Sequence, residues 1–177
     1  MSTSLYDRIA NTAILSGQYD DGLTAFYSLD PDASPNHIQH SGVTRTAVRM
    51  DAGASGLGVP VKSVWLRFRK YGLPTGNITV NVRKGSDDSV ASTIGTFPIE
   101  AVPSDTEYEV VIRNRFGNSY NMEATDLVSI EYPSNAVNGF EITTHSTASN
   151  PTNYTGRSFN GTVYASTSDP LCIKILG

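Results

Sequence analysis

The side chains best suited to binding chemistry are one tryptophan and several arginines, which recur at every second position. Aromatic rings stack on sugar rings, while guanidinium and amide groups hydrogen-bond hydroxyl or acidic groups. Tryptophan and arginine also dominate protein–protein contacts. If the segments that carry these residues are neighbouring strands, they form one ligand or subunit face, which comprises Trp65, Arg67, Arg69, Asn81, Arg83 and Arg113.

Acidic turns offer a second chemistry, calcium binding. Sandwich domains bind calcium through loop carboxylates and backbone carbonyls. The turn "GSDDS" supplies the calcium candidates Asp87 and Asp88, although its spacing is not that of an EF-hand. Aspartates in turns also cap the backbone through their own side chains, and this alternative stays open. Apart from calcium, the sequence indicates no cofactor.

Catalysis receives little support from the sequence. His37 and His40 stand three apart after a proline, in a segment that reads as a loop, and no third metal ligand can be named. No G-x-S-x-G elbow occurs. Glu109 and Glu131 lie on polar sides of expected strands, where solvated glutamates are common. The sequence therefore predicts a protein that is not an enzyme.

Charge divides the chain into two parts. Residues 1–43 hold five aspartates and one arginine and so carry the whole formal charge of −4, whereas residues 44–177 are neutral. We expect an acidic N-terminal arm over 1–43, with Asp20, Asp21, Asp30 and Asp32 as arm contacts to the arginine-bearing face, in the same chain or a neighbour. The charge argues against a nucleic-acid partner, which would require a basic surface.

No apolar run approaches the length of a membrane span, so membrane insertion is not expected. The N-terminus lacks the basic and apolar regions of a signal peptide. The single cysteine, Cys172, excludes an internal disulfide and lies in the apolar run "LCIKIL", which indicates a buried thiol.

The hydrophobic period from residue 46 onward is two, which is typical of strands. Polar turns rich in Gly, Pro, Asn and Asp separate the runs, and no crossover helix intervenes. The expected strands lie within residues 46–50, 61–72, 77–85, 107–117, 126–135, 139–145, 162–166 and 171–176. This pattern predicts an all-β protein, an antiparallel β-sandwich over residues 44–177, in the form of an eight-stranded jelly roll, with an immunoglobulin-like sandwich as the alternative. The run "LTAFYSL" in the arm is expected to pair at an edge of this sandwich or with a neighbour.

Three segments carry a resemblance to a known group of domains: "GLPTGNITVNVRK", "NSYNMEATDLVSIEYPSNAVNGFEI" and "SDPLCIKILG". Over residues 44–177 the pattern resembles jelly-roll domains of the carbohydrate-binding-module type found in phage and archaeal virion and cell-surface proteins. The resemblance implies a β-sandwich used for binding or as a structural module, and it assigns no functional residue.

Two functions follow as expectations. The first is a structural subunit at a virion surface, such as a capsid decoration or head or tail accessory protein, whose arm contacts neighbouring copies or a capsid protein. The alternative is a carbohydrate-binding module of a secreted or cell-surface protein, which binds glycans around Trp65.

Overall fold

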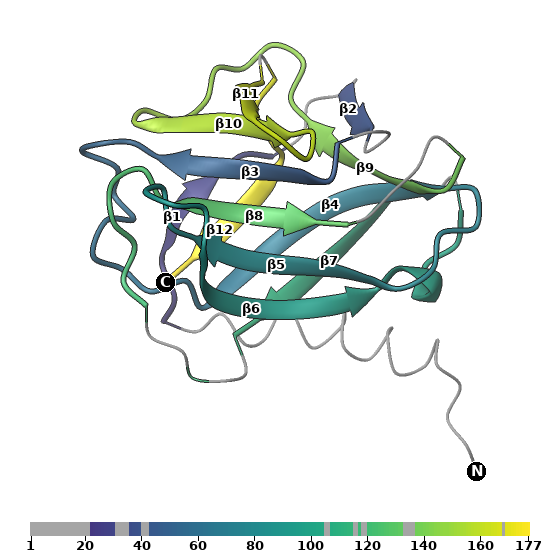
Figure 1. The fold of residues 1–177 in the computed structure, drawn as a ribbon, viewed down its shortest axis with the longest axis horizontal. Coiled ribbons are helices and arrows are strands. Elements are labelled where there is room, and N and C mark those ends of the chain that lie inside the picture. Colours follow the sequence, from purple (N-terminus) through teal and green to yellow (C-terminus); the bar gives the residue numbers. More distant parts are fainter. Residues whose placement is uncertain are drawn as a thin grey trace.

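The computed structural model describes residues 22–30, 36–39, 43–104, 107–114, 117, 120–132, 137–167 and 169–177, with only the backbone of 36–39. These residues form a sandwich of two antiparallel sheets, shown as two crossing layers in Figure 1. Sheet A contains β1 (Ala25–Ser28), β2 (Asn36–Gln39), β4 (Ser63–Tyr71), β7 (Glu107–Arg113), β9 (Gly139–Thr144) and β12 (Ile173–Leu176). Sheet B contains β3 (Arg45–Met50), β5 (Asn77–Arg83), β6 (Val90–Pro98), β8 (Leu127–Glu131), β10 (Tyr154–Phe159) and β11 (Tyr164–Ser166).

Strand β4 organises sheet A. It pairs with β7 along residues 63–69, with β12 along 63–66 and with β9 along 68–71. Since a strand has only two edges, β12 and β9 share one edge of β4 end to end, and β7 takes the other. Strand β1 then pairs with β12, and β2 pairs with β9. In sheet B the order is β11-β10-β3-β8-β5-β6.

The core lies between the sheets, where alternate residues of each strand point inward. In β4 the inward residues are Val64, Leu66 and Phe68, and in β5 they are Ile78, Val80 and Val82, all at most 1% exposed. The expected inward faces of these two strands are therefore confirmed. Cys172 is also buried, as expected.

The sandwich prediction is confirmed, whereas the eight-stranded jelly roll stays a prediction. The described residues form two sheets of six strands each. Four of these strands lie outside the eight expected segments: the short edge strands β1 and β2 in sheet A, and β6 and β10 in sheet B, which have nine and six residues. The sequence analysis missed β6 and β10, because "VASTIGTFP" and "YTGRSF" contain mostly small or polar residues and show little apolar alternation.

The described part of the arm belongs to the sandwich. Strand β1 lies within the run "LTAFYSL" and pairs at the edge of β12, as one of the two expectations had it. Both Phe26 and Tyr27 are buried because the register shifts between Ala25 and Tyr27. The Tyr27 hydroxyl donates to the Leu171 carbonyl oxygen at 3.0 Å.

The Phe26 ring packs against Gly56, which has no side chain. A Cβ placed on Gly56 would lie 2.5 Å from the Phe26 ring, so a larger residue at position 56 would exclude it. The boundary at residue 44 thus divides the chain by charge, but β1 and β2 are strands of the same sheet as β4.

We expect Phe26→Ala to lower the free energy of unfolding by about 3 kcal/mol, because it removes a buried ring and leaves a cavity. Ser28→Ala on the same strand is the control, since Ser28 is exposed, and it should change that free energy by less than about 0.5 kcal/mol. Urea denaturation of the three proteins measures both effects. Equal stability of Phe26→Ala and the parent chain would show that β1 contributes nothing to the core.

Candidate functional site

The outer face of sheet A carries four of the six residues of the expected binding face, three on β4 and one on β7. Trp65, Arg67 and Arg69 are partly exposed and alternate with the buried residues of β4, as predicted. Each arginine is engaged by a carboxylate from a neighbouring strand. Arg67 pairs with Glu107 of β7 at 2.6 Å, and Arg69 pairs with Glu141 of β9. These pairs hold the guanidinium groups on the face, although partly exposed pairs add little stability.

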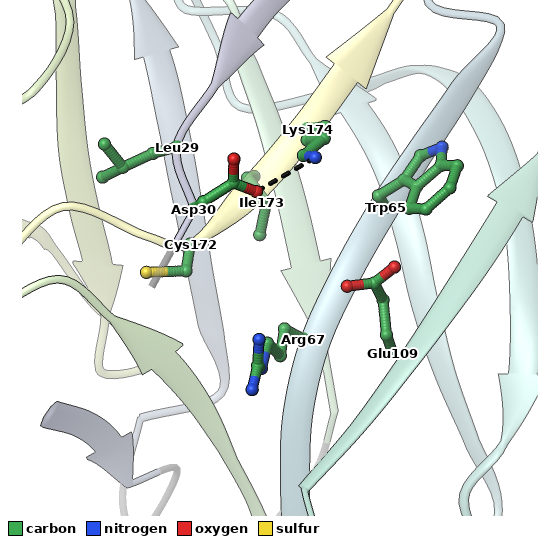
Figure 2. Close-up of a pocket in the computed structure, with 8 residues that line it drawn as sticks. All are labelled: Leu29, Asp30, Trp65, Arg67, Glu109, Cys172, Ile173 and Lys174. Atoms are coloured by element: carbon green, nitrogen blue, oxygen red, sulfur yellow. Dashed lines mark ion pairs between the residues drawn. The ribbon is translucent and has the colours of Figure 1, made fainter. Parts of the chain in front are cut away.

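Trp65 lies beside a contact between the arm and the body. The Lys174 amine is 5.7 Å from the centroid of the Trp65 ring, within the range of a cation–π interaction. The same amine pairs with the Asp30 carboxylate at 3.0 Å. Figure 2 shows Lys174 between Asp30 and Trp65, with Glu109 and Arg67 lower in the view. Of the four expected arm contacts, Asp30 therefore meets a base of this face, while Asp20, Asp21 and Asp32 lie outside the described residues.

The recess at this place is small. It is lined by Leu29, Asp30, Trp65, Arg67, Glu109, Cys172, Ile173 and Lys174 and has a volume of about 10 Å³. That volume holds no more than about one water molecule. Any ligand or protein that binds Trp65 therefore lies on the surface rather than in a pocket.

The remaining predicted residues divide between the two sheets. Arg113 lies on β7, opposite Ser63 of β4, so it shares the side of sheet A with Trp65. Asn81 and Arg83 lie on β5, in sheet B, and point away from the core on the opposite side of the sandwich. The prediction that they stand beside Trp65 and Arg67 is wrong, because β4 and β5 are consecutive in the chain but belong to different sheets.

The outer face of sheet B carries its own polar network. Arg83 donates to both carboxylate oxygens of Glu131, through Nε at 2.6 Å and Nη2 at 3.0 Å. Ser129 Oγ donates to Glu131 Oε1 at 2.6 Å, and Asn81 Oδ1 accepts from Thr93. Burial alone would raise the pKa of Glu131, but hydrogen bonds from Arg83, Ser129 and Asn81 outweigh it, so this pKa is lowered.

Asp88 joins a loop to this network. Its backbone has φ +58, and its carboxylate accepts from Arg45 Nη1 at 2.6 Å and from the Tyr164 hydroxyl at 3.0 Å. The Arg45 guanidinium also stacks on the Phe159 ring, 3.9 Å from its centroid. The loop between β5 and β6 is thereby fixed to β3 and β11. Burial and the Asp88 carboxylate raise the pKa of Tyr164 to about 12.

The calcium candidates are engaged by protein donors. Asp87 Oδ1 accepts from the backbone N–H and the hydroxyl of Ser89, which is the turn-capping alternative. Nearby Asp126 is buried and accepts from Gly85 N, Glu123 N and the Tyr120 hydroxyl. No group of three or more metal-ligating side chains occurs within the described part of the chain. The calcium site at Asp87 and Asp88 stays a prediction.

A shallow hollow of about 280 Å³ lies on sheet B beside this network. It is lined by Thr44, Arg45, Asn77, Thr79, Glu131 and Tyr132. Arg45 and Glu131 stand directly opposite each other on β3 and β8, yet each is bonded to another partner. The hollow thus presents a fixed guanidinium and a fixed carboxylate on a rigid sheet.

The sequence reasoning missed Arg45, Tyr164 and Phe159. Arg45 begins a strand in which the next three residues are all buried, so no strict alternation marks it in the sequence. What was lacking was the strand order, which brings β3, β5, β8 and β11 together across long separations in the chain. The histidines form no cluster that the structure describes. His145 Nδ1 accepts backbone N–H groups of Thr147 and Ala148, only the backbone is described at His37, and His40 lies outside the described residues.

The comparisons with known proteins identify no relative. No family model, no curated protein and no solved structure matches this chain. In the described residues, no helix is long and apolar enough to cross a membrane.

We expect the Glu131 network to make stability depend on pH. A carboxylate with a lowered pKa in the folded state contributes stability above its unfolded pKa, near 4.5, and loses it as pH falls through the folded value. The difference in unfolding free energy between the parent chain and Glu131→Gln should therefore shrink as the pH is lowered below about 4.5. Urea denaturation at a series of pH values measures it. Parallel curves for the two proteins through this range would contradict the assignment.

Proposed function

We propose that this chain is a non-enzymatic structural subunit of a larger protein assembly, and that β1 of one copy docks on β12 of a neighbouring copy. The observation behind the proposal is the position of β1 in sheet A. This strand lies at the edge of sheet A, next to β12 in Figure 1, and pairs with no other described strand. A strand held by one partner at an edge is the kind of element that copies of a protein exchange.

The surface of the body on which β1 packs is specific for this strand. It combines main-chain pairing with β12, a space for the Phe26 ring over Gly56, and the hydrogen bond from Tyr27 to Leu171. The Tyr27 ring also meets the Tyr154 ring edge to face, with centroids 5.3 Å apart. An exchanged strand makes the same contacts as the strand in its own chain, so exchange changes which copies are joined and not how the sandwich folds.

Charge favours the same docking. The acidic segment 1–43 meets the neutral body at the Asp30–Lys174 pair, and Lys174 lies over Trp65. Complementary charge speeds association and selects the register of docking more than it adds affinity. The virion surface is the setting we propose for this assembly, on the strength of the resemblance of residues 44–177 to jelly-roll domains of virion proteins.

Strand exchange can be trapped by a disulfide. Ser28 and Lys174 are opposite each other in the β1–β12 pairing, a geometry that a disulfide can bridge. We expect oxidised Ser28→Cys/Lys174→Cys, in a Cys172→Ser background, to give covalent dimers or larger species on non-reducing gels. Covalent dimers are expected because, when β1 is exchanged, the two cysteines of each disulfide belong to different copies.

The matched control places both cysteines within the body. Arg157→Cys/Ser166→Cys joins β10 to β11, which are consecutive in the chain, and should stay monomeric after oxidation in the same background. Quantitative oxidation of the Ser28–Lys174 pair within single chains, at every protein concentration, would contradict the proposal.

Glycan binding is the second candidate, and the hollow on sheet B favours it. Arg45, Asn77, Thr79 and Glu131 offer donors and acceptors on rigid strands, as sites for polar ligands do. Around Trp65, by contrast, the recess holds about one water and Lys174 lies near the ring. If the chain binds a glycan, we therefore place it over sheet B.

A glycan array distinguishes these positions. We expect any glycan signal of the parent chain to fall at least tenfold in Arg45→Ala, through the loss of a charged donor, and to persist in Trp65→Ala. The reverse pattern would move the site to sheet A. Absence of signal from the parent chain would remove this second candidate.

A further inference from the structure

We propose that one end of the sandwich is a second self-association surface, which pairs with the same surface of another copy. We call it the loop-end patch and define it as the turn 72–76 between β4 and β5 together with residues 137–138 before β9. Figure 1 shows the β4–β5 connection and the start of β9 at the same end of the molecule. The inference goes beyond strand exchange, because it uses no residue of β1 or β12.

The patch exposes two large apolar side chains side by side. Leu73 is 81% exposed and Val137 is 71% exposed. The Leu73 N–H donates to Asn138 Oδ1 at 2.7 Å, which joins the two loops. A Cβ on Gly72 would lie 2.3 Å from the Val137 carbonyl oxygen, so the two backbones touch. Single exposed apolar residues are ordinary, whereas adjacent ones at a shared tip are typical of a contact surface.

The turn that presents Leu73 is held from several sides. Ser104 Oγ donates to the Gly72 carbonyl at 3.0 Å, and the Tyr132 hydroxyl donates to the Thr75 carbonyl at 2.8 Å. The carbonyl oxygen of Gly76 accepts from Ile99 N, while Gly76 N donates to Glu100 Oε1. Pro74 is buried, which leaves Leu73 on the outside. A turn whose backbone is already fixed loses little backbone entropy when a partner covers it.

Charge indicates a second copy as the partner. The chain has a net charge of −4, so identical copies repel each other over most approaches. The segments 71–82 and 132–140 contain no charged residue. Within them, residues 72–73 contact residues 137–138 at this end. The carboxylate of Glu100 does reach the turn. It accepts a hydrogen bond from the Gly76 N–H, and the positive charge of Lys70 partly offsets its negative charge. A patch whose own residues carry no charge can pair with its copy across a two-fold axis, the commonest symmetry of homo-oligomers.

Sedimentation velocity of the full chain tests the patch. We expect the parent chain to associate with rising concentration from the micromolar to the millimolar range. Leu73→Asn/Val137→Asn should weaken that association at least tenfold, because it removes both apolar contacts. The control is Val90→Asn/Val163→Asn, which changes two exposed valines outside the patch and should leave the association unchanged.

A covalent readout separates this patch from strand exchange. In a Cys172→Ser background, Leu73→Cys should oxidise to a dimer faster than Val163→Cys, whether or not β1 is exchanged between copies. This readout also decides the matter if the double asparagine variant fails to fold. The proposal is overturned if Leu73→Cys and Val163→Cys dimerise at equal rates, or if the double asparagine variant folds and associates like the parent. Binding of the parent chain to phosphatidylcholine vesicles that the double variant loses would also overturn it, since the patch would then be a membrane contact.

Discussion

The structure depends on the pairing of β4 with three other strands. This strand of nine residues binds β7 along one edge and divides its other edge between β12 and β9. Strands β1 and β2 reach the sheet only through β12 and β9. The strict alternation of β4 serves both sides at once, with Leu66 and Phe68 in the core and Trp65 and Arg67 on the outer face.

This arrangement engages most charged side chains on the two outer faces with one another. On sheet A the arginines of β4 are paired with carboxylates, and on sheet B Arg83, Glu131, Asp88 and Arg45 bond to one another. Such networks fix side chains on a sheet at small net gain in stability. We therefore place the proposed contacts between copies at an edge strand, β1, and at a loop end, around Leu73.

The sequence predicted what depends on local alternation and missed what depends on strand order. The inward residues of β4 and β5 and the buried Cys172 could be read from period and composition. For "LTAFYSL", pairing at an edge was one of two alternatives. The placement of Asn81 and Arg83 could not, since consecutive strands of a sandwich can lie in either sheet. Tyr164 and Asp88 are far apart in the chain, and only the long-range pairing of β10 with β3 brings them together. The sequence predicted that Asp30 of the acidic arm contacts a basic side chain of the body. It did not predict that this side chain is Lys174.

The proposed joining of copies through β1 is tested most directly by an isotope-filtered nuclear Overhauser experiment. Equal amounts of ¹³C-labelled and unlabelled chain are unfolded together, refolded and brought to a concentration at which the protein self-associates. Tyr27 and Tyr154 have ring centroids 5.3 Å apart, close enough for cross-relaxation. The account predicts cross-peaks between Tyr27 of labelled copies and Tyr154 of unlabelled copies. A self-associated sample in which Tyr27 shows cross-peaks only to Tyr154 of its own chain would contradict it.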